Sequence, residues 1–457
     1  MTIYLEAKSN VRSNSLTEES LGRGAGIADA FAIETKTIQK LRQRILPFVL
    51  LLFVVALIDR NNIGLAALTM NRELAIRSQQ FGLVFGIFFI GYLIFEIPSN
   101  LLLHRIGARV WIARILLSWG IVATLTGLVQ TVQQLYVLRF LLGLAEAGYF
   151  PGIVLYLTYW FPQRERARAL ALLLVAAPIT TILGAPISGF ILDHTHWLGI
   201  SSWRWLLILE GAPAIILGAL TYVLLPSNPQ EATFLTADEK QWIRDELGHE
   251  ERRKLESRRY SSLQALVSGR VWYLVLIYFG LMIGLYSLNS WAPQLVKSLS
   301  SQYSNTVVGF LLAIPNLVAL AAMVAVSRSS DRRLERRYHV AIPALVGAVA
   351  LLLLGTTPSP FFSVTLLCLL TVGVFSCLSP FWALPSEFLT GYSAAAGIAL
   401  INSIGNLGGL VGPFAIGVVA ERSGTLSAGL ALAAVPVFMA ATLVLLLPKT
   451  VRPFDKT

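Results

Sequence analysis

The sequence predicts an all-α integral membrane protein with twelve transmembrane helices in two six-helix bundles. The 457-residue chain is 55% hydrophobic and 13% charged, with a mean hydropathy of +0.68, whereas a soluble domain carries roughly 25% charged residues. Apolar runs of about twenty residues recur along the chain, which is the length that a helix needs to cross a bilayer. One long segment rich in charges of both signs, residues 226–270, divides these runs six and six.

The lengths of the apolar runs give the positions of the spans. In chain order they are expected at residues 45–68, 81–103, 108–130, 134–159, 168–192, 203–225, 271–293, 306–327, 339–357, 361–384, 394–420 and 425–447. The polar residues 1–40 are expected to be a disordered tail, and 449–457 a short second tail. The predicted organisation is a bundle over 41–225, a linker over 226–270 and a second bundle over 271–448.

The net charge of +11 is compatible with nucleic-acid binding, but the lysines and arginines gather in loops between apolar runs. Basic loops follow the second, fourth and eighth spans, whereas 130–134 and 358–360 carry no positive charge. Loop 69–80 is an exception, with Arg72 and Arg77. Since positive loops stay in the cytoplasm, both termini and the linker are expected to face it. No apolar core of a signal peptide occurs at the N-terminus.

Two spans contain charged residues that a lipid-facing helix would not tolerate. Asp59 and Arg60 lie in the first, and Arg139 and Glu146 in the fourth. A charge at that depth costs at least ~2.5–3.5 kcal/mol, so it needs a partner or a function. Arg139 and Glu146 share one helix face, about 10 Å apart along the axis. Asp59 is expected at a depth similar to Arg139, where the two could pair.

This arrangement suggests a proton-coupled path for an anion. Arg139, with Arg60 as a second candidate, would bind a carboxylate through its guanidinium fork. Asp59 and Glu146 would take up protons, Glu146 the more readily, because desolvation raises the pKa of a carboxyl and a nearby arginine lowers it. The alternative is a permanent structural salt bridge, and for Arg60 structural pairing is as good an interpretation as substrate contact.

Uncharged polar residues extend the candidate site. Tyr92 lies four residues before Glu96 in the second span and could donate a hydrogen bond to a carboxylate or hydroxyl. Glu96 is either a further proton site or a structural partner of the basic loops. The candidates in the second half are Ser379, Trp382, Asn402 and Asn406. Asn402 and Asn406 share a helix face, and their alternative role is hydrogen bonding between closely packed helices.

Five segments carry a resemblance to a known family. They are DRNNIG at 59–64, FIGYLIFEIPSN at 89–100, LRFLLGLAEAGYFPG at 138–152, YWFPQRERARA at 159–169 and SSWRWLLILEGAPA at 201–214. With them the chain resembles, over nearly all of residues 40–448, the major facilitator superfamily, more narrowly its anion:cation symporters and their tartrate-transporter-like members. The resemblance implies proton-driven uptake of a small organic anion across the cell inner (plasma) membrane, with two halves that rock around a central site. It also implies that Asp59 and Glu146 are the carboxyls that couple transport to protons and that Arg139 binds the anion. Tyr92 and Trp382 match family positions whose side chains line the central cavity.

Two basic loops occupy corresponding places in the halves, SNLLLHRIGARVW at 99–111 and SRSSDRRLERRYH at 327–339. Their gating candidates are Arg105, Arg109, Asp331 and Arg332. The arginines could pair with acids or helix ends of the neighbouring bundle and so stabilise one conformation. The superfamily's loop pattern has an acid before its arginine, and His104 stands at that position here.

The favoured function is therefore proton symport of a small organic anion by a monomer embedded in the bilayer. Exchange of organic anions, or export of an acidic metabolite, would use the same residues and stays open. An enzyme is not expected, because no Ser–His–Asp arrangement or metal cluster occurs within the spans and the five histidines lie at or outside span ends. No cofactor, metal or nucleic acid is expected. Glu210 and Glu387, near span ends, are interpreted as structural.

Overall fold

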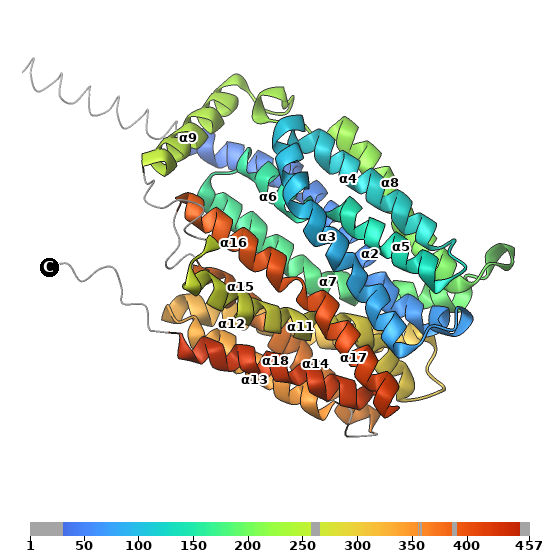
Figure 1. Ribbon diagram of the computed structural model, residues 1–457. Helices are drawn as coiled ribbons and strands as arrows, with labels where there is room; N and C mark the ends of the chain where they lie inside the picture. Colours follow the sequence, from blue (N-terminus) through green and yellow to red (C-terminus); the bar gives the residue numbers. More distant parts are fainter. Residues whose placement is uncertain (1–30, 257–265, 355, 357–358, 386–390, 448–457) are drawn as a thin grey trace, which may run out of the picture.

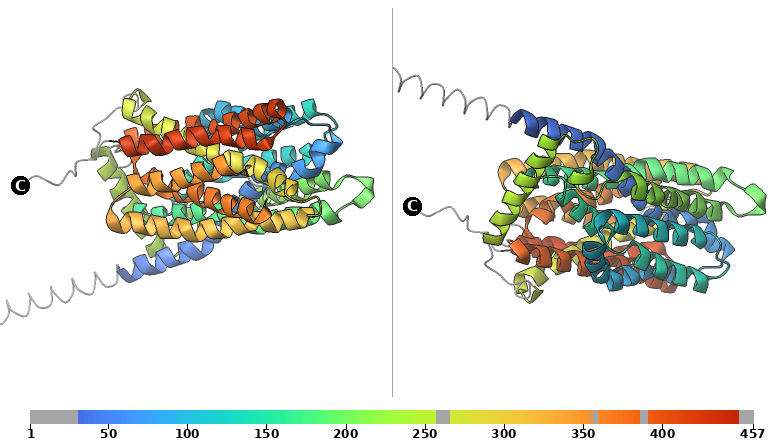
Figure 2. Two further views of the ribbon diagram at one scale, coloured as in Figure 1. Left: turned by 90° about the horizontal axis from the view of Figure 1, so that it is seen from below. Right: turned by 90° about the horizontal axis from the view of Figure 1, so that it is seen from above.

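The computed structural model describes residues 31–256, 266–354, 356, 359–385 and 391–447. Long helices run side by side along one common direction and form two neighbouring bundles (Figure 1, Figure 2). In the described part of the chain, eleven helices are long and apolar enough to cross a membrane, and the shorter apolar helix Arg337–Leu353 makes twelve. The predicted fold class is confirmed.

Each bundle contains six spans, and the helix bounds follow the expected ones closely. The first bundle comprises α2 (Leu46–Glu73), α3 (Ser78–Ile106), α4 (Ala108–Thr126), α5 (Val132–Glu146) with α6 (Tyr149–Thr158), α7 (Gln163–His194) and α8 (Ser202–Leu224). The second comprises α11 (Gly269–Ser298), α12 (Asn305–Arg333), α13 (Arg337–Leu353), α14 (Pro360–Ser376) with α15 (Leu378–Ala383), α16 (Gly391–Gly405) with α17 (Gly408–Ser423), and α18 (Leu426–Leu446). Two short 3-10 helices, η1 (Trp197–Gly199) and η2 (Pro229–Glu231), flank α8.

The first bundle extends further at its start than expected. Residues from Phe31 onward, the first described residue, are helical, although they lie inside the stretch 1–40 that the sequence predicted as a disordered tail. This extra helix contacts the linker helix α9 (Ala237–Glu256), where Lys40 Nζ donates to Glu239 at 2.8 Å. Burial raises the pKa of Glu239, but hydrogen bonds from Lys40 and the Thr236 N–H outweigh it and hold that pKa below its usual value. The linker helix therefore docks on the first bundle.

Three expected single spans are interrupted within the membrane. The span at 134–159 breaks at Ala147 and Gly148, the span at 361–384 at Cys377, and the span at 394–420 between Gly405 and Gly408. Gly148 has φ +82°, and a Cβ there would lie 2.2 Å from Ser99 Oγ, so only glycine fits. Non-helical backbone at membrane depth is tolerated where protein or a cavity covers it, and the turn at Ala147 and Gly148 is covered by α3 through Ser99.

The two bundles pack closely at the end opposite α9. We call this the distal end, where the loops 74–77, 127–131, 195–201, 299–304 and 424–425 lie, and the end with α9 the linker end. Here α3 packs on α17 and α7 on α12. Glycines allow these backbones to approach closely at four positions, Gly82, Gly189, Gly309 and Gly417. A Cβ added at any of them would lie only 2.3–2.4 Å from a carbonyl oxygen of the other bundle. The distal end of the interface is closed.

Two carboxylates reinforce this closure across the bundles. Asp193, at the end of α7, accepts four hydrogen bonds from the first residues of α12: from Asn305 N at 3.1 Å and Nδ2 at 2.8 Å, and from Thr306 N and Oγ1 at 2.7 Å each. Glu421 of α17 accepts from Arg77 Nη1 at 3.1 Å and from the Gln79 N–H at 3.0 Å. We call the Asp193 contacts with Asn305 and Thr306 the distal seal.

Candidate functional site

The central feature of the site is a buried ion pair between Arg60 of α2 and Glu146 of α5. The Glu146 side chain is 1% exposed and that of Arg60 is 21% exposed. Glu146 is the last residue of α5, directly before the break at Ala147 and Gly148, so the helix interruption places its carboxylate inside the bundle. The sequence had left open whether Arg60 pairs with an acid, and in this conformation it does.

Asp59, the neighbouring acid, accepts hydrogen bonds only from neutral side chains among the described residues. It is 2% exposed and accepts hydrogen bonds from Trp119 Nε1 and, at 3.0 Å, from Asn62 Nδ2. The expected pair between Asp59 and Arg139 is absent among the described residues, which corrects the sequence analysis. Similar depth in the membrane was the basis for that pair, but depth does not determine which way a side chain points around its helix.

Arg139, the second buried arginine of the site, forms no ion pair with an acid in the described part of the chain. It is 2% exposed, and its Nε donates to the Val84 carbonyl of α3 at 3.2 Å. Its guanidinium carbon lies 5.3 Å from the centre of the Phe88 ring, and that of Arg60 lies 5.5 Å from the same ring. Two guanidinium groups therefore lie close to one aromatic ring, whose face attracts cations in an apolar interior.

An aromatic wall covers the arginines. Tyr92 is 6% exposed and lies 6.0 Å from Phe88, with the Arg60 guanidinium 5.7 Å from its ring. From the second bundle, Tyr286 of α11 packs 4.5 Å from Phe89. Tyr286 was missed by the sequence analysis, because a single tyrosine within an apolar span gives no distinctive signal. It brings the second bundle to the Arg60 site.

A chain of hydrogen bonds connects this wall to Glu96 across the bundle interface. Tyr286 OH donates to Asn406 Oδ1 at 2.9 Å, and Asn406 Nδ2 donates to Asn402 Oδ1 at 3.1 Å. Asn402 Nδ2 then donates to Glu96 Oε1 at 3.3 Å, and Ser403 Oγ to Glu96 Oε2 at 2.5 Å. Glu96, 4% exposed, therefore contacts the second bundle rather than the basic loops.

The two remaining candidates of the second half pack within their own bundle. The Trp382 ring lies 4.9 Å from Tyr278 and 5.5 Å from Phe381. Ser379 Oγ is 3.0 Å from Ser327 Oγ. The structure brings Asp59, Arg60, Arg139, Glu146, Tyr92, Asn402 and Asn406 toward the bundle interface, and shows no contact of Trp382 or Ser379 with the described arginines.

The basic loops form contacts within each half. Arg109 Nη1 lies 3.9 Å from Glu231 in η2, and Asp331 accepts from Arg336 Nη1 at 2.6 Å. The expected pairing of loop arginines with the neighbouring bundle is not seen for Arg109 in this conformation. Arg105 and Arg332 are exposed and have no ion-pair partner among the described residues. The His104 side chain and Glu387 lie outside the described part of the chain.

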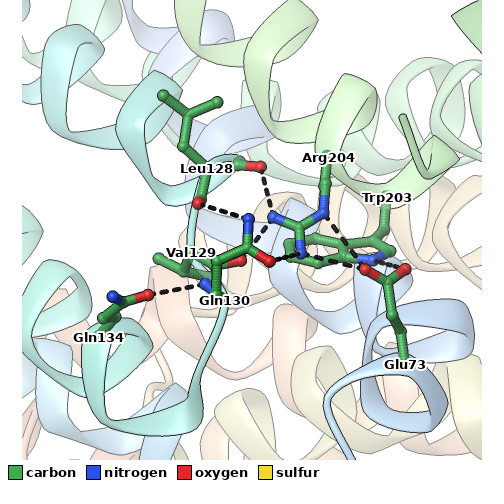
Figure 3. A network of polar contacts seen from close by, with 8 residues as sticks. Glu73, Leu128, Val129, Gln130, Gln134, Trp203 and Arg204 are labelled. Carbon is green, nitrogen blue, oxygen red and sulfur yellow. Dashed lines mark hydrogen bonds and ion pairs between the residues drawn. The ribbon is translucent and has the colours of Figure 1, made fainter. Parts of the chain in front are cut away.

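A separate polar network holds the distal loops of the first bundle in place (Figure 3). Arg204 donates to the carbonyls of Gly127 at 3.2 Å and Val129 at 2.5 Å, which satisfies the end of α4. It also donates to Glu73 at 3.0 Å, and Trp203 Nε1 donates to the same carboxylate at 2.8 Å. The Trp203 and Arg204 pair of the segment SSWRWLLILEGAPA is thus structural.

Between the arginine site and the distal seal lies a second polar region that the sequence analysis did not identify. It is a cavity between α2, α7, α11, α12 and α14. Its hydroxyl and amide side chains are Asn61, Asn62, Thr180, Thr181, Ser188, Asn289, Asn316 and Thr371. No charged side chain lines it among the described residues. We call it the outer cavity.

Two six-helix bundles that enclose buried charges and amides at their interface define the class of a polytopic membrane transporter. The family model of the Major Facilitator Superfamily matches residues 49–413. The chain belongs to this superfamily, which consists of membrane transporters rather than enzymes.

The relatives agree with this assignment. A protein of Agrobacterium vitis named "Putative tartrate transporter" is 45% identical over 418 residues, covering 92% of this chain and 96% of the relative. A "Quinolone resistance transporter" of Acinetobacter baumannii is 39% identical, with 87% and 91% covered. Among solved structures, a bacterial homolog of the human lysosomal transporter Spinster matches with a TM-score of 0.73 at 15% identity, covering 89% and 96%. The xylose transporter XylE of E. coli matches with 0.71 at 17%, covering 89% and 99%. At these identities the structures show the fold alone.

Proposed function

We propose that this transporter is a proton-coupled symporter for uptake of a small organic anion, tartrate or a related hydroxy acid. The observation that supports it most is the Arg60–Glu146 ion pair beside Arg139, which has no acidic partner among the described residues. Arg139 thus offers a buried guanidinium that is in no ion pair, and such a group attracts an anion. The 45% identity to a relative named as a tartrate transporter supports the substrate class.

Coupling follows from competition for Arg60. While Glu146 is ionised it occupies this guanidinium, and an incoming carboxylate would meet a like charge. A proton on Glu146 removes that charge and frees the Arg60 fork for the substrate. Loss of the proton on the opposite side restores the pair and displaces the anion. Because the pair is nearly desolvated, this exchange is tightly linked to substrate occupancy.

The geometry favours a substrate with two acidic or polar ends. Arg60 and Arg139 both lie close to the ring of Phe88, so each could hold one carboxylate of a dicarboxylic acid. Hydroxyl groups would meet the amides of Asn402 and Asn406, which already form a hydrogen-bonded row with Tyr286. Trp382 and Ser379 would contribute to this recognition only after a rearrangement within the second bundle.

Alternating access would use the two ends of the interface in turn. The distal seal closes one end, and the Glu96 contacts with Asn402 and Ser403 lie in the half nearer the linker. We infer that the distal end faces the outside of the plasma membrane and that both termini and α9 face the cytoplasm, since basic loops gather at the linker end. Because one chain contains the whole site, a monomer suffices for transport.

Export of an acidic compound is the second candidate, and exchange of anions is its close variant. The relative named as a quinolone resistance transporter, at 39% identity, favours the export direction. The same ion pair would serve, with Glu146 exchanging its proton for an outgoing molecule.

Uptake into proteoliposomes distinguishes these functions. Labelled tartrate, galactonate and 4-hydroxyphenylacetate would be offered with and without an inward proton gradient, and with and without internal anion. Symport predicts accumulation driven by the gradient alone. Uptake that ignores the gradient and requires internal anion would instead show exchange. No uptake of the three acids, together with gradient-driven efflux of a loaded fluoroquinolone, would show export.

A further inference from the structure

A third buried acid, Glu210 of α8, adjoins the outer cavity and has no assigned role. It is 7% exposed, and its Oε2 has no hydrogen-bond partner, whereas its Oε1 contacts Ser188 Oγ of α7 at 2.5 Å. Ser188 itself lines the outer cavity. The sequence analysis interpreted Glu210 as structural, yet a structural acid in a lipid-embedded bundle would be expected to have both oxygens satisfied.

The contacts of Ser188 limit how well an ionised Glu210 could be stabilised. The Ser188 hydroxyl donates to Glu210 Oε1 at 2.5 Å, but its Oγ also lies 2.9 Å from the Gly184 carbonyl, and a hydroxyl has a single proton to donate. Glu210 Oε2 has no hydrogen-bond partner among the described residues. The carboxyl therefore receives at most a shared hydrogen bond from Ser188, which fits a neutral Glu210 in this conformation.

No cationic side chain that would stabilise an ionised Glu210 faces it among the described residues. Glu210 has no ion-pair partner there, and the groups that face it are Ser188 from α7, and Asn62 and Asp59 from α2. From α4, the atoms nearest the adjoining Gly211 belong to neutral residues, Ala123 and Thr124. An ionised carboxylate in such surroundings costs several kcal/mol. Glu210 would ionise only when water from an opened outer cavity reaches it.

Asn62 connects Glu210 with the proposed coupling site. It lines the outer cavity, donates to Asp59 at 3.0 Å and lies beside Glu210. Two buried acids, Asp59 and Glu210, are thus each separated from the cavity by one neutral polar side chain, Asn62 or Ser188. Neither acid contacts an arginine, in contrast to Glu146.

We propose that Glu210 is an additional proton-binding carboxyl of the transport cycle, which exchanges its proton with the outer cavity through Ser188. When the cavity is open to the outside, the ionised carboxylate accepts the Ser188 hydroxyl proton at Oε1 while a hydronium ion in the cavity gives a proton to Ser188 Oγ and becomes water. One proton has then passed from the cavity to Glu210, and the Ser188 hydroxyl is restored. This inference rests on the proton-coupled function proposed above.

The test compares Glu210→Gln with wild type and with Ser188→Ala in proteoliposomes. A one-unit pH gradient contributes a factor of about ten to accumulation for each coupled proton. Glu210→Gln should therefore accumulate tartrate about tenfold less at that gradient while keeping substrate counterflow, because glutamine mimics the neutral acid. Ser188→Ala keeps the carboxyl, so its accumulation at equilibrium should match wild type while its initial gradient-driven rate falls.

Each result decides between the two proposals. If wild type is proton-coupled and Glu210→Gln accumulates tartrate equally, Glu210 stays permanently protonated and this inference is wrong, while the symport proposal stands. If tartrate accumulation by wild type does not depend on the proton gradient, both the symport proposal and this inference are wrong. If Glu210→Gln does not fold, infrared spectra of wild type and Ser188→Ala would be compared instead. A band of a protonated carboxyl that changes with pH, and that is shifted in Ser188→Ala, is expected. A band that neither pH nor the Ser188→Ala substitution changes would overturn the inference.

Discussion

The distal seal offers a quantitative test of how the two bundles are held together. Asp193 accepts four hydrogen bonds from Asn305 and Thr306 across the interface. Asp193→Asn removes the charge and leaves one acceptor oxygen, so about two of the four contacts are lost. A hydrogen bond to a charged group contributes ~1.5–3 kcal/mol, but the half-buried position of Asp193 calls for a discount for solvent screening. We expect a net loss of about 1–2 kcal/mol.

This loss should shift the population toward states with an open distal end by about 5–30-fold, since 1.4 kcal/mol corresponds to a factor of ten. The assay is the labelling rate of Thr181→Cys, which lies in the outer cavity, by a membrane-impermeant maleimide added from the distal side. Cys368 and Cys377, both free thiols, would first be replaced by alanine. Labelling should accelerate in Asp193→Asn by that factor.

A matched control is available at the same end of the molecule. Glu73 also accepts hydrogen bonds from Trp203 and Arg204, but all three residues belong to the first bundle (Figure 3). Glu73→Gln should lower the melting temperature of the protein without accelerating the labelling of Thr181→Cys. Equal labelling of Asp193→Asn and wild type, or equal acceleration by Glu73→Gln, would refute the assignment of the seal to Asp193.

Three further predictions concern the site and the linker. Arg139→Lys removes the planar guanidinium fork, so the affinity for tartrate measured by calorimetry should fall about 10–100-fold, the equivalent of ~1.5–3 kcal/mol. An unchanged affinity would exclude Arg139 as the anion ligand. Glu96→Gln removes the charge and leaves one of the two oxygens that accept from Asn402 and Ser403. Counterflow should slow while binding is retained, and lost binding would place Glu96 in the substrate site instead. Glu239 has a pKa lowered in the folded state, so its stabilising contact with Lys40 is present above its unfolded pKa and lost as pH falls through the folded one. The hydrogen-exchange protection factors of α9 should accordingly fall in wild type as the pH drops below the usual pKa of a glutamate, and should already be lower at neutral pH in Glu239→Gln. Protection in the variant equal to that of wild type at neutral pH would contradict the docking.

The positions of the spans could be predicted because apolar run length is a local property of the sequence. The helix breaks could not, since the turn at Gly148 depends on Ser99, a residue of another helix. For the same reason the helix over Phe31–Lys40 was taken for a tail: its contact with α9 through Glu239 exists only in the folded molecule.

The charged residues of the site could be found from their cost in a membrane, but their partners could not. Depth along the helix suggested Asp59 with Arg139, whereas the structure pairs Arg60 with Glu146. Azimuth around the helix, which decides the partner, depends on packing between α2, α3 and α5.

Residues whose role depends on the other bundle were the hardest to predict. Glu96 was interpreted as either a further proton site or a partner of the basic loops, and the structure places it against Asn402 and Ser403 of the second bundle. Tyr286 and the outer cavity were missed because hydroxyl and amide side chains are common in packed membrane helices and give no distinctive signal in sequence.

The central claim, that Glu146 couples protons to the anion by competing for Arg60, is tested most directly by one comparison. Glu146→Gln and wild type would be reconstituted in parallel, and labelled tartrate followed both under an inward proton gradient and in counterflow without one. The account predicts that Glu146→Gln loses gradient-driven accumulation and retains counterflow, because Arg60 stays free for the anion. Accumulation equal to wild type in Glu146→Gln would contradict it and leave the Arg60–Glu146 pair a structural salt bridge.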